Sequence, residues 1–156
     1  MNPSRLRALI VDDESLGRER VRIFLEDDER VEIVGECPGG RAAVEAVLKG
    51  GVDVVFLDIQ MPDLDGFGVI SELERSGKPI PSIVFVTAYD NHAVQAFDVH
   101  AVDYLLKPID RERLKKALDR VGDLRQKGGV DDAIRSQLQA LLSETGRVEE
   151  GGRRRI

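Results

Sequence analysis

Three aspartates stand directly after apolar runs typical of buried strands, and they are the first residues whose chemistry needs an explanation. Asp12 and Asp13 follow Leu6–Val11, and Asp58 follows the uninterrupted apolar run Val54–Leu57. In a parallel sheet the carboxyl ends of the strands meet at one edge, where open α/β sheets bind ligands. Carboxylates gathered there repel one another and raise each other's pKa unless a cation joins them. If the strands that end at Val11 and Leu57 are neighbours, the sequence therefore predicts a cation site formed by the three aspartates.

The available ligand atoms favour a hard cation at this site. An all-oxygen set of carboxylates suits Mg²⁺ or Mn²⁺, with water molecules completing the octahedron. The two histidines, His92 and His100, are not spaced for zinc, and Cys37 is the single cysteine. We therefore expect Mg²⁺ or Mn²⁺.

Two further strand ends supply groups that would bind an anion. Thr87 follows the strand expected at 81–86 and offers a hydroxyl, and Lys107 follows the strand expected at 102–106 and offers a mobile ammonium. A carboxylate nucleophile, a divalent cation, a hydroxyl and an ammonium together form a phosphoryl-transfer site. On this hypothesis Asp58 attacks phosphorus and becomes an aspartyl phosphate, while Lys107 and the cation neutralise the transferring group.

The elements that must position these side chains follow a regular alternation of strands and helices. Strands are predicted at 6–11, 31–34, 53–57, 81–86 and 102–106, and helices at 15–27, 41–49, 66–75, 91–97 and 110–124. This alternation predicts an α/β fold, a doubly wound five-stranded parallel sheet with right-handed crossovers and helices on both faces.

Composition narrows the class of protein. The chain has 156 residues, of which 42% are hydrophobic and 33% charged, and a net charge of −6. The acidic balance argues against nucleic-acid binding by these residues, because such domains usually carry a basic patch. We find no apolar run of transmembrane length and no signal peptide, and one cysteine fits a reducing compartment. We therefore expect a soluble, cytoplasmic protein that makes no membrane contact.

Four motifs in this order resemble the receiver domain of bacterial two-component response regulators. They are Val11–Glu14, Leu57–Gly66, Val86–Ala88 and Tyr104–Pro108, and the resemblance covers about residues 6–121. It implies a flavodoxin-like sheet of strand order 2-1-3-4-5. It also implies a phosphorylation-dependent switch, not an enzyme in the usual sense, whose phosphoryl donor is a sensor histidine kinase.

The resemblance assigns roles to the acidic cluster and its surroundings. Asp58 matches the phosphoacceptor. Asp12 and Asp13 match the acidic pair that positions Mg²⁺, with Asp13 as a direct ligand, and the backbone carbonyl of Gln60 matches the third protein ligand. Gln60 and Tyr89 match positions that tune the lifetime of the aspartyl phosphate.

The same resemblance assigns roles to the anion-binding side. Thr87 matches the hydroxyl that moves onto the phosphoryl group, and Tyr104 matches the aromatic residue that turns inward with it. Lys107 matches the phosphoryl-binding lysine, and its bond to Pro108 is expected to be cis.

The C-terminal part of the chain is expected to connect the receiver to an effector domain. We predict a receiver at 1–124, followed at 125–156 by a linker containing an amphipathic helix at 131–143 and leading to an effector domain absent here. The segment 93–109 resembles receivers that precede a LytTR-type DNA-binding domain. The resemblance implies a homodimer formed through the fourth helix, fifth strand and fifth helix on phosphorylation, with DNA bound only through the missing domain.

Three alternatives remain open from the residues. One is a stand-alone receiver without a DNA-binding output. Another is a Mg²⁺-dependent aspartyl phosphatase, although Gln60 stands where such enzymes carry a second aspartate as general acid and base. The last is a nucleotide-binding module, which the acidic loop after the first strand disfavours. We interpret Asp63 and Asp65 as turn residues.

Overall fold

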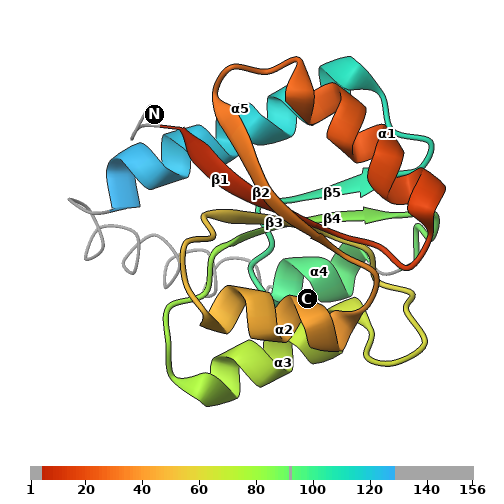
Figure 1. Ribbon diagram of the computed structural model, residues 1–156, viewed down its shortest axis with the longest axis vertical. Coiled ribbons are helices and arrows are strands. Elements are labelled where there is room, and N and C mark those ends of the chain that lie inside the picture. The colour runs from red at the N-terminus through yellow and green to blue at the C-terminus, as the bar shows by residue number, and fades with distance from the viewer. Residues whose placement is uncertain (1–4, 92, 129–156) are drawn as a thin grey trace, which may run out of the picture. The chain divides into compact units, whose positions relative to one another are not determined.

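The computed structural model describes residues 5–91 and 93–128 (Figure 1). The chain forms two compact units, Met1–Val121 and Gly122–Ile156. The described part of the second unit is the end of the last helix, and the helix predicted at 131–143 lies outside the described residues.

The first unit contains a five-stranded parallel sheet. Its order is β2-β1-β3-β4-β5, as the resemblance to receivers implied. Strand β2 continues to Cys37, past the predicted end at Val34, because an edge strand can carry exposed polar residues such as Glu36. The strands are β1 Leu6–Val11, β2 Val31–Cys37, β3 Val54–Leu57, β4 Ser82–Thr87 and β5 Asp103–Leu106.

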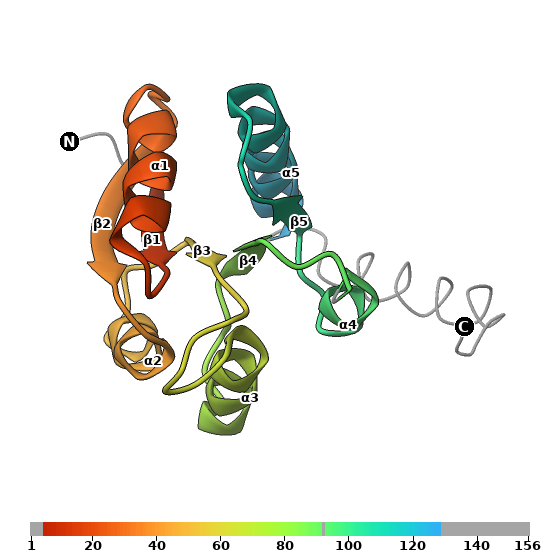
Figure 2. The same cartoon turned by 90° about the vertical axis from the view of Figure 1, so that its right-hand side faces the viewer.

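Helices cover both faces of this sheet, which confirms the doubly wound architecture. Helix α1 and the part of α5 up to Val121 lie on one face, and α2, α3 and α4 lie on the other (Figure 2). The predicted boundary between receiver and linker falls within α5, which continues to Gly128. The helices are α1 Ser15–Glu26, α2 Gly40–Leu48, α3 Gly66–Ser76, α4 Ala93–Asp98 and α5 Arg111–Gly128.

The central strand β3 is buried on both faces, which explains its uninterrupted apolar sequence. Phe56 packs into the hydrophobic cluster beneath α1 and α5, whereas Val55 and Leu57 pack into the cluster beneath α2, α3 and α4. All four residues of the strand are buried. The strand therefore holds the backbone that precedes Asp58 in one place.

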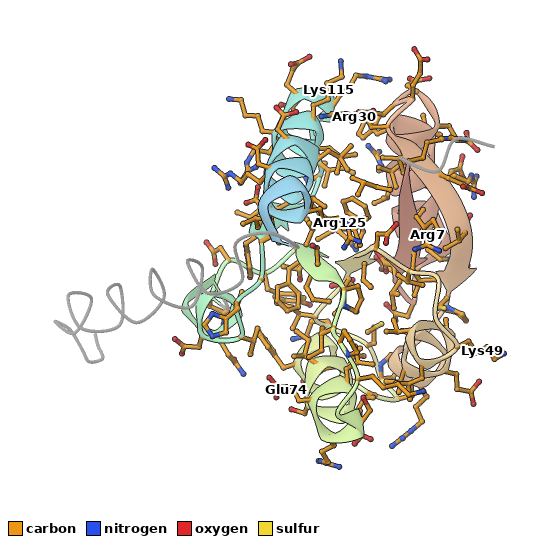
Figure 3. All side chains as sticks on the ribbon, turned by 90° about the vertical axis from the view of Figure 1, so that its left-hand side faces the viewer. Arg7, Arg30, Lys49, Glu74, Lys115 and Arg125 are labelled. Carbon is orange, nitrogen blue, oxygen red and sulfur yellow. The ribbon has the colours of Figure 1, made fainter. Side chains whose placement is uncertain are left out.

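Charged side chains lie around the outside of the helices and at the ends of the strands (Figure 3). At the amino end of β3, the Arg7 guanidinium pairs with the buried Asp53 carboxylate at 3.0 Å. Arg30 pairs with Asp28 at 2.8 Å and reaches Asp119 on α5 at 2.5 Å. These pairs tie loops to neighbouring strands and helices far from the carboxyl edge of the sheet.

Asp103, at the start of β5, is a buried carboxylate held by two arginines of α5. Its oxygens lie 2.7 Å from Arg113 and 2.9 Å from Arg120. Burial by itself raises the pKa of Asp103, but the hydrogen bonds from Arg113 and from the Tyr104 backbone outweigh it and the pKa falls below the ordinary value. The ionised carboxylate therefore fastens α5 to the edge strand.

Asp103→Asn is expected to lower the free energy of unfolding by about 1–2 kcal/mol near neutral pH, because the buried carboxylate loses its charge and its ion pairs. The loss is smaller than for a fully buried ion pair because both arginines are partly exposed to solvent. A lowered folded-state pKa adds stability above the unfolded-state value, and this stability is lost as the pH falls through the folded-state pKa. The difference between wild type and variant should therefore shrink as the pH drops below 3.8. Urea denaturation across this range measures it. The exposed Asp98→Asn is the control, and a pH-independent difference would contradict the assignment.

Candidate functional site

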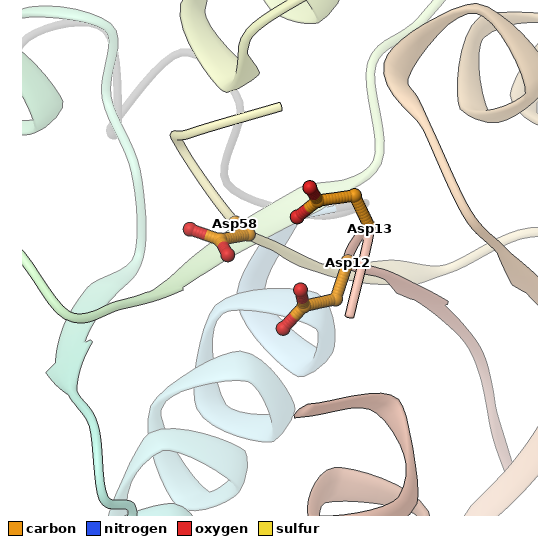
Figure 4. Close-up of side chains that lie close together, drawn as sticks. All are labelled: Asp12, Asp13 and Asp58. Atoms are coloured by element: carbon orange, nitrogen blue, oxygen red, sulfur yellow. The ribbon is translucent and has the colours of Figure 1, made fainter. Parts of the chain in front are cut away.

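The carboxyl edge of the sheet gathers the three predicted acids. Strands β1 and β3 are neighbours with Val11 opposite Leu57, so the residues that follow them, Asp12 and Asp58, come side by side. One carboxylate oxygen from each of Asp12, Asp13 and Asp58 lies within 4.8 Å of the others (Figure 4). Asp12 and Asp58 are buried, and Asp13 is exposed. The predicted acidic cluster is therefore present.

Lys107 bridges two of these acids. Its Nζ atom donates hydrogen bonds to Asp12 Oδ2 at 2.7 Å and to Asp58 Oδ2 at 3.0 Å. The backbone N–H of Lys107 bonds to the carbonyl of Thr87 at 2.8 Å, which brings the end of β5 to the end of β4. The peptide bond between Lys107 and Pro108 is cis, as the resemblance implied.

The charges of the site are only partly balanced. Burial raises the pKa of Asp58, and the neighbouring Asp12 adds to this rise, while the hydrogen bond from Lys107 opposes it without cancelling it. Burial lowers the pKa of Lys107, but hydrogen bonds to Asp12 and Asp58 outweigh that effect and raise it. Lys107 is therefore charged at neutral pH, and three carboxylates beside one ammonium leave an excess of negative charge.

This donor set fits a hard divalent cation. All three side chains offer carboxylate oxygens, the ligand type that Mg²⁺ prefers. Asp12 and Asp58 are buried, and Asp13 is exposed to solvent. The backbone N–H of Gln60 donates to Asp58 Oδ1 at 3.3 Å, so the loop after β3 returns close to the cluster. An added cation would relieve the repulsion among the acids.

Thr87 and Tyr104, predicted to act together, are linked through Tyr89. Thr87 is fully buried at the end of β4, and its hydroxyl accepts a hydrogen bond from the Tyr89 backbone N–H at 3.4 Å. The Tyr104 hydroxyl donates to the Tyr89 carbonyl. The Tyr104 ring lies 6.2 Å from that of Phe85, measured between centroids. The loop after β4 is therefore held by both predicted switch residues.

Two residues of α1 that lie against the acidic cluster were not identified from the sequence. A Cβ atom on Gly17 would lie 2.2 Å from Asp12 Oδ2 and 3.2 Å from Lys107 Nζ, so α1 can approach the bridge only where this side chain is missing. Arg18 donates to the backbone carbonyl of Asp12 at 2.7 Å. Gly17 lies at helical spacing from the buried Val21, but this spacing does not reveal which atoms it meets.

Comparison with known proteins decides the family. Residues 8–119 match the Response regulator receiver domain. The chain belongs to this family. A receiver is a phosphoacceptor switch rather than a true enzyme, and it implies a cognate histidine kinase. The acidic triad described above is typical of the Mg²⁺ site of a receiver.

Curated relatives extend beyond this receiver. This chain is 48% identical over 125 residues to the transcriptional regulatory protein BtsR of Escherichia coli K12, and the match covers 80% of this chain and 52% of BtsR. It is 46% identical over 115 residues to the sensory transduction protein LytT of Bacillus anthracis, covering 74% and 46% of the two chains. The chain thus spans about half the length of these relatives.

Solved structures share the receiver fold. The response regulatory domain of mrkE from Klebsiella pneumoniae matches with a TM-score of 0.71 at 32% identity, over 78% of this chain and 99% of that domain. The isolated REC domain of RcsB from Salmonella enterica, solved with the phosphomimetic BeF3⁻, matches with a TM-score of 0.66 at 28% identity, over 74% and 86% of the two chains. Among the helices of residues 5–91 and 93–128, none has the length and apolar character needed to cross a membrane.

Proposed function

We propose that Asp58 of this receiver accepts a phosphoryl group from a histidine kinase, and that Asp12, Asp13, Asp58 and the Gln60 backbone carbonyl hold the Mg²⁺ that supports the transfer. Mn²⁺ has the same ligand preferences and would serve as a substitute. The single observation that carries this proposal is the acidic cluster with Lys107 bridging Asp12 and Asp58. Such an arrangement pairs a nucleophile with a mobile positive charge.

The contacts of the site suggest how the transfer proceeds. A carboxylate oxygen of Asp58 attacks phosphorus, and the bond from phosphorus to the donor nitrogen breaks with its electrons leaving on the donor. The ammonium of Lys107, already 3.0 Å from Asp58, moves to an oxygen of the transferred group and offsets its charge. A cation held by Asp12, Asp13 and Asp58 would supply further charge neutralisation.

The contacts of Thr87 and Tyr104 support a switch role. A phosphoryl oxygen on Asp58 offers the Thr87 hydroxyl a charged acceptor. Movement of Thr87 toward it would disturb the Thr87–Tyr89 hydrogen bond and, through the Tyr89 carbonyl, the position of Tyr104. Phosphorylation then shifts a pre-existing equilibrium by its different affinity for the two arrangements. In this proposal Gln60 and Tyr89 also influence how fast water removes the group.

We place the output beyond this receiver. Its similarity to the transcriptional regulatory protein BtsR, and the LytTR-like segment 93–109, support a cytoplasmic regulator whose DNA-binding domain follows residues 125–156. The surface of α4, β5 and α5 would form the phosphorylation-dependent homodimer, and Leu106 on the edge strand β5 is exposed there. Dimerisation would pair two DNA-binding domains on repeated half-sites.

The test is phosphorylation of the purified chain by a small donor. Incubation with acetyl phosphate and Mg²⁺ should add one phosphoryl group to the intact mass, and peptide mapping should place it on the segment containing Asp58. Chelation with EDTA should suppress the gain, and Mn²⁺ should restore it. A gain that is independent of divalent cations, or one mapped to another segment, would contradict the proposal.

A further inference from the structure

The loop that joins β3 to α3 is tied to the beginning of α2 by Asp63. The Asp63 carboxylate accepts a hydrogen bond from the Gly40 backbone N–H at 3.0 Å and one from the Arg41 backbone N–H at 3.1 Å. It also accepts one from the Leu64 backbone N–H at 2.9 Å. The residue predicted to be a local turn former therefore makes contacts with a helix that begins 23 residues earlier.

Helix α2 depends on Asp63 because it has no capping side chain of its own. Its N-cap residue is Gly39, which makes no side-chain hydrogen bond. The first N–H groups of a helix have no partner within the helix, and a carboxylate is a favoured acceptor for them. The N–H groups of Arg41 and Gly40 accordingly lower the pKa of Asp63. The cap of α2 thus comes from the loop after β3.

Two glycines make this contact possible. A Cβ atom on Gly39 would lie 2.9 Å from both carboxylate oxygens of Asp63, and one on Gly40 would lie 2.2 Å from the Leu64 carbonyl oxygen. Side chains at these positions would push the loop away from α2. We call the contact formed by Gly39, Gly40 and Asp63 the loop clamp.

The loop clamp lies three residues beyond Gln60 along the same loop. On the strand side, the Gln60 backbone N–H contacts Asp58 Oδ1 at 3.3 Å. At the base of the loop, the Gly66 backbone N–H bonds to the Ile59 carbonyl at 2.9 Å. The backbone that carries the Gln60 carbonyl is therefore held by β3 on one side and by the loop clamp on the other.

We propose that Asp63 is a positioning residue for the cation site, because the loop clamp sets where the Gln60 carbonyl stands relative to the acidic cluster. This inference rests on the proposed function, in which that carbonyl is a ligand. Groups that orient ligands without touching the metal typically change metal affinity by about 10- to 100-fold. The hydrogen bonds from Gly40 and Arg41 to Asp63 are the only hydrogen bonds that join α2 to the loop 59–65 in the described part of the chain.

The first experiment compares Asp63→Ala with the wild type in Mg²⁺ binding and in labelling. Calorimetry should show Mg²⁺ affinity lowered by about 10-fold. In labelling by acetyl phosphate, the Mg²⁺ concentration for half-maximal rate should rise by about the same factor, while the rate at saturating Mg²⁺ changes by less than about 2-fold. Backbone amides of Gly40, Arg41 and Leu64 should exchange hydrogen faster in the metal-free variant.

A second variant separates positioning from simple support of α2. Gly39→Ser combined with Asp63→Ala gives the helix a local serine cap but leaves the loop untied. The backbone at Gly39 is extended, and the atoms nearest its added Cβ belong to the Asp63 carboxylate, which the alanine removes. The double variant should regain the melting temperature lost in Asp63→Ala while keeping the weakened Mg²⁺ affinity.

The outcomes separate the two proposals. Recovery of Mg²⁺ affinity together with thermal stability in the double variant would show that Asp63 only supports α2, and would overturn the inference. Unchanged affinity in Asp63→Ala, with Mg²⁺-dependent labelling of the wild type, would overturn it as well while leaving the proposed function intact. A wild type that neither binds Mg²⁺ nor accepts a phosphoryl group would refute the proposed function itself.

Discussion

Asp58→Asn is expected to lower phosphoryl incorporation from acetyl phosphate by at least about 100-fold, because an amide oxygen is a far weaker nucleophile than a carboxylate. The substitution keeps the size of the side chain and removes one negative charge from the cluster. The pKa of Asp58 is raised by burial in the folded state, so the ionised carboxylate costs stability near neutral pH. The variant should therefore be at least as stable as the wild type. Intact-mass measurement over a time course, with thermal unfolding beside it, checks both statements.

The matched control is Asp65→Asn on the same loop. Asp65 is the N-cap of α3, where its carboxylate accepts a hydrogen bond from Gly68, and asparagine is an equally good cap. Labelling of this variant should match that of the wild type. Full labelling of Asp58→Asn would remove Asp58 from the phosphoacceptor role, whatever the control shows.

Lys107→Met is expected to destabilise the metal-free protein by about 2–3 kcal/mol, because two buried carboxylates lose the ammonium that they share. Removing one partner of a buried pair costs about 3–5 kcal/mol, and the partial exposure of Lys107 reduces this cost. Methionine keeps the unbranched, flexible shape of the side chain. Mg²⁺ should then raise the stability of the variant more than that of the wild type, since Lys107 no longer competes for Asp12 and Asp58. Urea denaturation with and without Mg²⁺ measures both effects.

Lys78→Met provides the control for loss of a lysine. Its ammonium is exposed and contacts only the Leu48 carbonyl, at 3.4 Å, among the hydrogen bonds described. The free energy of unfolding of Lys78→Met should stay within about 0.5 kcal/mol of the wild-type value, and Mg²⁺ should stabilise the variant and the wild type equally. An equal gain from Mg²⁺ in Lys107→Met and the wild type would mean that Lys107 and the cation do not compete for the acids.

The fold and the acidic cluster were predictable because each depends on local patterns. A strand buried on both faces must be apolar throughout, as Val54–Leu57 is, and parallel strands must end at the same edge. The strand order implied by the resemblance to receivers then places Asp12 beside Asp58, and the structure has this order. Leu114, Ala117, Leu118 and Val121 of α5 repeat at helical spacing in the sequence, and all four are buried.

The contacts that sequence reasoning missed depend on packing between distant segments. Asp63 reads as a turn residue because Pro62 and Gly66 flank it, and nothing near it indicates a helix that lacks its own cap. The approach of Gly17 to the bridge between Asp12 and Lys107 likewise follows from how closely α1 lies against the sheet. Such contacts are set by the distance between elements, which hydrophobic periodicity does not encode.

The two ends of β3 hold their acids in different ways. At the amino end, Asp53 is fixed to Arg7, whose guanidinium is always charged and binds through two nitrogen atoms. At the carboxyl end, Asp58 is held by Lys107, a partner on a flexible stem that it shares with Asp12. The phosphoryl transfer proposed at Asp58 would therefore exchange one counter-ion for another while the strand stays anchored at its far end. A conformational change that follows phosphorylation of Asp58 would therefore pass through the loops beside it, because β3 itself is not free to slide.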